Sequence, residues 1–264
     1  MSYERISLEQ KDGVAVLKFN HPEVLNAVGA RMLEELTDAV SEIAAPDSDV
    51  RCVLLTGEGR AFSSGANLSD PGRQGSAGRR GGTGSSLRTG YHPLLFTLRD
   101  LDVPIVTAVN GVAAGVGMSF ALVGDIVCAA RSAYFLQAFA RIGLIPDGGA
   151  TFMLPRLVGW GRAMELSLLA ERLPAEQALE WGLINRVFDD DELLEGAITI
   201  ARQLADGPSS LGLIRRAYWA SCSNSYEEQL DLEAKLQTEA GRTRDHKEGV
   251  QAFLEKRTAR FTGN

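Results

Sequence analysis

Residues 104–121 read Pro-Ile-Val-Thr-Ala-Val-Asn-Gly-Val-Ala-Ala-Gly-Val-Gly-Met-Ser-Phe-Ala, and they give the clearest indication of the fold class. Residues 104–111 form a nearly continuous apolar run of strand length, and residues 115–123 follow with the character of a helix. Strands that are apolar on both faces are typical of parallel sheets covered by helices. The stretch therefore predicts a buried strand, a glycine turn and a helix within an α/β protein.

The same alternation continues on both sides of this stretch. Apolar runs predict further strands at residues 13–20, 50–56, 126–130 and 183–188. Helical spacing of apolar residues predicts one helix that ends before Pro46 and others at residues 161–171 and 174–182. Strands that alternate with helices favour a parallel sheet.

Composition narrows the class of protein further. The chain has 264 residues, 45% of them hydrophobic, which is enough to bury a large core. Its 34 acidic and 27 basic residues give a net charge of −7, which disfavours a nucleic-acid partner because phosphate binding needs a basic face. No apolar run reaches the roughly 20 residues of a membrane span, and the first residues lack the regions of a signal peptide. We expect a cytoplasmic protein with no membrane partner.

Cysteine and histidine are few and scattered. Cys52 and Cys128 stand inside apolar stretches, as reduced core thiols do. The three histidines lie far apart along the chain, so we expect no metal site.

The last part of the chain has a different character from the rest. Residues 201–264 hold ten basic and nine acidic residues, and they carry helical patterns without a strand signal. The sequence therefore predicts two regions, an α/β core over residues 1–200 and a helical region over residues 201–264.

A glycine- and serine-rich segment at residues 70–88 carries a local charge of +3. Its four arginines, Arg73, Arg79, Arg80 and Arg88, are opposed by one acid, Asp70. Two interpretations remain open: a solvated linker, or a basic lid that meets an anionic ligand.

Acid–base chemistry requires a titratable group in a desolvated place, and only two acids, Asp125 and Asp147, lie between Val103 and Met164. Asp125 immediately precedes a strand, where a structural turn or cap role is expected. Asp147 lies in the turn Ile-Pro-Asp-Gly-Gly before a helix. It is either an N-cap or the best candidate for a catalytic base.

Two glycine-containing segments each follow a strand and are able to present backbone N–H groups to an oxyanion. They are residues 110–121 and residues 60–68, and together they could hold a thioester enolate. Residues 117–121 also resemble a loose nucleophile elbow around Ser119, with Asp147 and His246 following in the chain order of a serine hydrolase. Because His246 stands in a charged stretch, the hydrolase is the weaker alternative.

Four motifs, at residues 20–27, 59–68, 108–117 and 173–184, are together similar to the signatures of the enoyl-CoA hydratase/isomerase (crotonase) superfamily. The resemblance implies a crotonase-like spiral of ββα units with a C-terminal helical trimerisation region. It also implies a homotrimer or a hexamer that binds an acyl-CoA substrate in an extended groove. Coenzyme A is then part of the substrate, and no separate cofactor is expected.

The resemblance also assigns candidate site residues. The oxyanion donors carry over to the backbone N–H groups of Ala66 and Val116. The two glutamates of the hydratases fall at Ser119 and Phe139, which cannot serve as acids, so Asp147 is left as a single catalytic carboxylate. Contacts with the substrate are expected from Leu25, Ala27, Ala61, Ser64, Gly65, Asn67, Leu68, Gly115, Ser119 and Phe139.

These residues imply an acyl-CoA isomerase. Its reaction would be a double-bond shift, or a rearrangement of an aryl-epoxide thioester as in the family branch that acts on ring-1,2-epoxyphenylacetyl-CoA. An enoyl-CoA hydratase, a serine-dependent acyl-CoA hydrolase and a non-catalytic acyl-CoA-binding subunit remain as alternatives. Phe96, Phe139, Phe152 and Trp160 either line a pocket for an aromatic acyl group or pack in the core.

Overall fold

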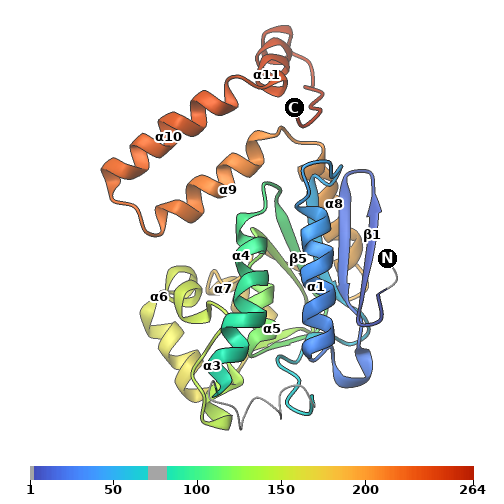
Figure 1. The fold of residues 1–264 in the computed structure, drawn as a ribbon, viewed down its shortest axis with the longest axis vertical. Helices are drawn as coiled ribbons and strands as arrows, with labels where there is room; N and C mark the ends of the chain where they lie inside the picture. The colour runs from blue at the N-terminus through green and yellow to red at the C-terminus, as the bar shows by residue number, and fades with distance from the viewer. Residues whose placement is uncertain (1–2, 71–81) are drawn as a thin grey trace.

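Two β-sheets of unequal size form the centre of the computed structural model, which describes residues 3–70 and 82–264 (Figure 1). The larger sheet has six strands in the order β1-β2-β3-β5-β7-β10, and the smaller has four in the order β4-β6-β8-β9. The strands are β1 Ile6–Lys11, β2 Val14–Phe19, β3 Cys52–Gly57, β4 Ala61–Ser63, β5 Ile105–Val109, β6 Val112–Ala114, β7 Ile126–Ala130, β8 Tyr134–Leu136, β9 Arg172–Pro174 and β10 Arg186–Phe188.

Helices connect and cover these strands. They are α1 Ala30–Ile43, α3 Gly82–Ser86, α4 His92–Asp100, α5 Val116–Ala121, α6 Ala150–Leu169, α7 Ala175–Glu180, α8 Leu193–Ala205, α9 Ser210–Ser221, α10 Tyr226–Ala240 and α11 Arg244–Glu255. Short helical turns η1 Pro22–Val24, η2 Leu87–Tyr91 and η3 Ala138–Ile142 complete the described elements.

The chain repeats a ββα unit. In each of three successive units, one strand joins the larger sheet, the next joins the smaller sheet, and a helix follows: β3-β4-α4, β5-β6-α5 and β7-β8-α6. The pairings from β2 through β10 in the larger sheet are parallel, and β3 and β5 are buried along their whole length. The α/β class and the crotonase-like spiral are therefore confirmed.

The elements that the sequence did not predict are mostly short. The strands of the smaller sheet have three residues each, too few to give an alternation signal, and β1 was also missed. The predicted helix at residues 161–171 corresponds to the second half of α6, which follows the non-helical Gly159, and the first half, from Ala150, was missed. Pro155 and the non-helical Gly159 inside α6 hide its first half from a pattern search.

The C-terminal region is helical throughout its described elements and extends away from the sheets (Figure 1). Helix α8 packs against the larger sheet, so the predicted division between residues 200 and 201 falls inside a helix that belongs with the core. The chain leaves the core after α8, at residues 206–209.

An ion pair with a buried arginine fastens α9 to the core. Arg215, only 5% exposed, donates through Nε to Asp125 Oδ2 at 2.6 Å and through its other nitrogens to the carbonyls of Leu98 and Leu101. Asp125 Oδ2 also accepts from the Ile105 N–H at 2.7 Å. Asp125 therefore has a structural role, as expected, but as the ion-pair partner of an arginine 90 residues further along the chain rather than as a turn or cap residue.

Several smaller predictions from the sequence can also be compared with the structure. Cys52 and Cys128 are buried, and burial raises the pKa of Cys52 to about 12 and that of Cys128 to about 11, so both stay protonated thiols. Asp70 accepts a hydrogen bond from the Ala30 N–H at the start of α1. The predicted lid arginines Arg73, Arg79 and Arg80 lie outside the described residues. No helix in the described ranges is long and apolar enough to cross a membrane.

Candidate active site

The two segments expected to supply oxyanion donors lie against each other. Gly65 has a φ of +98°, and a Cβ built on it would stand 2.7 Å from the Ala114 carbonyl oxygen and 3.7 Å from the Gly115 Cα. Only glycine fits this contact without strain. The next residue on each segment is a proposed donor, Ala66 on one and Val116 on the other. Within the described residues, neither of these two N–H groups donates a hydrogen bond.

A buried asparagine shapes the first segment. Asn26 has no exposed surface, and its Nδ2 donates to the carbonyls of Glu58 at 2.9 Å and Ala61 at 2.7 Å. Its Oδ1 accepts from the His21 N–H at 2.8 Å, and its backbone is left-handed with a φ of +55°. Asn26 was missed as a structural residue of the site, although it lies within the motif at residues 20–27.

Several of the residues expected to contact the substrate lie close to one another beside Asn26. The Ser64 N–H donates to the Leu25 carbonyl at 2.9 Å, and residues Val28 and Ala66 form an isolated parallel bridge next to Ala27. Ala61 is buried, whereas Leu68 is 55% exposed at the outer end of the segment. Asn67 follows Ala66 and accepts through Oδ1 from the Ser69 N–H.

The loop that carries Asp147 rests on the first turn of α5. The Ser119 hydroxyl donates to the Asp147 carbonyl oxygen at 2.9 Å. Gly148 has a φ of +61°, and a Cβ built on it would lie 2.9 Å from Ser119 Cβ and 3.0 Å from Val116 Cγ2. The Oδ1 atom of Asp147 is shielded from solvent. The carboxylate thus lies on a loop that touches the same helical turn as the Val116 N–H.

The two positions that hold glutamates in hydratases contain no acid here. Ser119 is 5% exposed on α5, and Phe139 is 7% exposed in η3 with its ring beside Gly115. Ser119 borders the Asp147 loop and Phe139 borders Gly115, and neither is able to act as a carboxylate.

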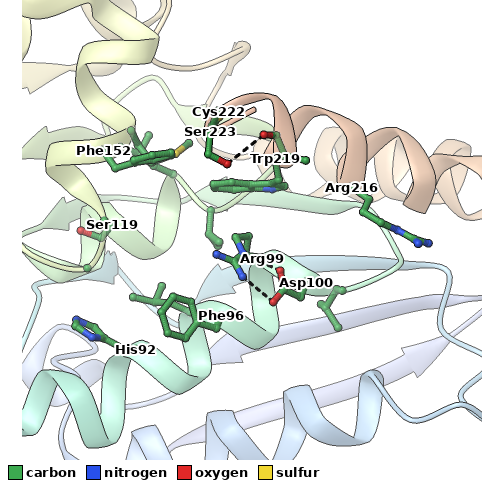
Figure 2. Close-up of a pocket in the computed structure, with 18 of the residues that line it drawn as sticks. His92, Phe96, Arg99, Asp100, Ser119, Phe152, Arg216, Trp219, Cys222 and Ser223 are labelled. Carbon is green, nitrogen blue, oxygen red and sulfur yellow. Dashed lines mark hydrogen bonds and ion pairs between the residues drawn. The ribbon is translucent and has the colours of Figure 1, made fainter. Parts of the chain in front are cut away.

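A cavity of about 790 Å³ opens onto this loop between α4, α5, α6 and α9 (Figure 2). Ser119 and Gly148 form part of its wall. Phe96 from α4, Phe152 from α6 and Trp219 from α9 line it as well. The cavity has the size and the mainly apolar lining of a small-molecule site.

The aromatic residues proposed from the sequence separate into two groups. Phe96 and Phe152 line the cavity, whereas Phe139 packs beside Gly115 and Trp160 is 73% exposed and absent from the cavity wall. Trp219 was missed, because only the tertiary fold brings α9 to this place.

Arg156 connects two walls of the cavity. Its guanidinium lies 3.7 Å from the ring centroid of Phe152, and it donates to the carbonyls of Phe152 at 2.8 Å and Cys222 at 3.4 Å. Arg156 therefore joins α6 to the end of α9.

The serine hydrolase alternative is not supported within one chain. His246 lies on α11, which Figure 1 shows at the far end of the molecule from α5, where Ser119 lies. In the part of the chain that the structure describes, no three His, Cys, Asp or Glu side chains gather as a metal site would require.

Comparison with protein families gives a match to the enoyl-CoA hydratase/isomerase model over residues 9–264. The chain belongs to the enoyl-CoA hydratase/isomerase family. This confirms the resemblance on which the sequence interpretation depended, and it makes the protein an enzyme of a family of acyl-CoA isomerases and hydratases.

Among members of the enoyl-CoA hydratase/isomerase family, the 1,2-epoxyphenylacetyl-CoA isomerase of Escherichia coli K12 is 47% identical over 252 residues, 95% of each chain. A Rhodobacter capsulatus protein named "Probable enoyl-CoA hydratase" is 45% identical over 264 residues, 100% of each chain. The crystal structure of an enoyl-CoA hydratase from Bacillus anthracis superposes with a TM-score of 0.89 at 31% identity, covering 99% of this chain and 100% of that one.

Proposed function

We propose that this protein is an acyl-CoA isomerase that uses Asp147 as a single catalytic carboxylate. The observation that supports this most is the seating of the Asp147–Gly148 loop on the helical turn of Val116 and Ser119, next to a cavity of acyl-group size. The absence of an acid at Ser119 and Phe139 argues against addition of water by two carboxylates.

The proposed reaction moves one proton. The Asp147 carboxylate removes the α-proton of a 3-enoyl-CoA, and the electron pair delocalises onto the thioester oxygen. The backbone N–H groups of Ala66 and Val116 stabilise that oxygen, at a few kcal/mol for each donor. The Asp147 carboxyl then returns the proton to the γ-carbon, which gives the conjugated 2-enoyl-CoA. This scheme uses coenzyme A only as part of the substrate and requires no separate cofactor.

The acyl group that we propose is aromatic. Phe96, Phe152 and Trp219 offer ring faces and edges to a planar group in the cavity. The Escherichia coli relative, named for 1,2-epoxyphenylacetyl-CoA, supports an aryl-epoxide thioester as one substrate. The name of the Rhodobacter relative, "Probable enoyl-CoA hydratase", supports hydration of an enoyl-CoA as the second candidate function.

The first experiment follows conjugated-enoyl absorbance when the protein meets trans-3-hexenoyl-CoA, with hydration of crotonyl-CoA measured in parallel. We expect isomerisation to exceed hydration, and we expect Asp147→Asn to lower the isomerisation rate roughly 10²- to 10⁴-fold because the acid–base group is lost. An unchanged rate in Asp147→Asn would contradict the assignment. Dominant hydration would favour the hydratase, and binding of CoA esters without turnover would favour a non-catalytic subunit.

A further inference from the structure

The side chain of Ser119 is buried at the boundary between the catalytic loop and α5. It is 5% exposed, and its hydroxyl donates to the backbone carbonyl of Asp147 rather than to any carboxylate or imidazole among the described residues. A hydroxyl with this partner is poorly placed to act as a nucleophile, because no base accepts its proton.

Packing reinforces this hydrogen bond. Gly148 lies directly against Ser119 and Val116, with no room for a methyl group between them. Val116 and Ser119 are three residues apart on α5, so they occupy the same face of one helical turn. The turn therefore contacts the Asp147 loop at two adjacent points.

The hydrogen bond also sets the direction of the loop. Fixing the carbonyl of residue 147 removes rotation of the peptide plane that follows Asp147, and so restricts where its carboxylate lies relative to the Val116 N–H. Proton transfer depends steeply on such placement, since a shift of about 1 Å costs roughly a hundredfold in rate.

We propose that Ser119 is a positioning residue, which holds the Asp147 carboxylate at a fixed place relative to the oxyanion donor on the same helix. This inference rests on the proposed isomerase function. It assigns a role to the serine that stands where the hydratases of the family have a glutamate.

The test compares Ser119→Ala and Ser119→Cys in the full-length protein with trans-3-hexenoyl-CoA as substrate. The KM for this thioester, and the Kd for saturated hexanoyl-CoA, which binds without a double bond to shift, report substrate contacts. We expect Ser119→Ala to lower kcat roughly 10- to 100-fold with KM and Kd nearly unchanged, and Ser119→Cys to recover part of the loss as a weak donor of similar shape.

Ser167→Ala is the matched control. Ser167 is half-buried on α6, and its hydroxyl donates to the Ala163 carbonyl at 2.8 Å, away from the cavity lining. We expect this control to keep the wild-type kcat. A kcat for Ser119→Ala within threefold of the Ser167→Ala value, or a parallel weakening of hexanoyl-CoA binding, would overturn the positioning role. Failure of the proposed function is detected separately, because the wild-type protein would then hydrate crotonyl-CoA faster than it isomerises trans-3-hexenoyl-CoA, or Asp147→Asn would keep the wild-type isomerisation rate.

Discussion

Gly148 is restricted both by its backbone conformation and by close packing, and it adjoins Asp147 in the candidate site. Its φ of +61° is left-handed, and its Cα hydrogen faces Ser119 and Val116 at close range. Any larger side chain there must move the loop that carries Asp147.

We therefore expect Gly148→Ala to lower the isomerase rate at least roughly tenfold, since the added methyl group displaces the Asp147 loop. Gly143→Ala is the control, because Gly143 also has a positive φ of +70° but an added Cβ would meet no atom within 4 Å. Both variants should lose about 1–2 kcal/mol of unfolding free energy from backbone strain. Chemical denaturation and steady-state rates check this, and equal rates in the two variants would contradict it.

Individual site residues could be found from the sequence where they lie in a motif or differ in type from their neighbours. Asp147 stood out as nearly the only acid in an apolar stretch, and the two glycine-containing segments after strands stood out as possible sources of oxyanion donors, whereas Ala66 and Val116 themselves were assigned by the family resemblance. Trp219 and Asn26 gave no such signal. The first reaches the cavity only through tertiary packing, and the second acts through hydrogen bonds to carbonyls more than 30 residues away.

Among the elements, α6 and α9 form adjoining walls of the cavity (Figure 2), and Arg156 links them through the Phe152 ring and the carbonyls of Phe152 and Cys222. Loss of the Arg156 contacts should make the positions of the Phe152 ring and the end of α9 less fixed, while the Asp147 loop keeps its own contacts.

We expect Arg156→Met to raise the KM for an arylacetyl-CoA thioester several-fold and to change the KM for a four-carbon thioester little, because the small group does not reach the wall. Arg162→Met is matched to it, since the Arg162 guanidinium lies 4.8 Å from the Trp181 ring and neither residue lines the cavity. Steady-state kinetics on both thioesters provide the measurement. Equal changes for both acyl groups would show that Arg156 does not govern selectivity.

Element prediction succeeded where an element had enough apolar residues to show a period. The long strands β2, β3 and β5 and the helix α1 were found, because their apolar residues repeat over five or more positions. Strands β4, β6 and β8 were not, because three residues cannot show an alternation. The second sheet of the spiral was therefore implied only by family resemblance.

Across the whole molecule, large apolar side chains remain exposed on the C-terminal helices. Phe253, Leu254 and Tyr218 are 82%, 74% and 74% exposed, and the groove between α9, α10 and α11 is lined largely by apolar residues. Exposed apolar patches of this kind mark contacts with another protein surface. They support the proposed homotrimer or hexamer.

We expect light scattering after gel filtration to give three or six times the 28.4 kDa of one chain. Phe253→Glu should shift this mass toward the monomer, because it places a charge in the apolar contact. Gln251→Glu, which adds the same charge at an exposed polar position of α11, should not. A monomeric wild-type protein would contradict the proposed assembly.

The attachment of α9 to the core has a consequence for the growing chain on the ribosome. The last strand ends at Phe188, and α8 completes the cover of the larger sheet at Ala205, so the polypeptide has all its strands before α9 emerges. Arg215 must then find partners made about 90 to 117 positions earlier. A nascent polypeptide halted before α9 would have both sheets and the Asp147 loop, but no Trp219 wall to enclose an acyl group.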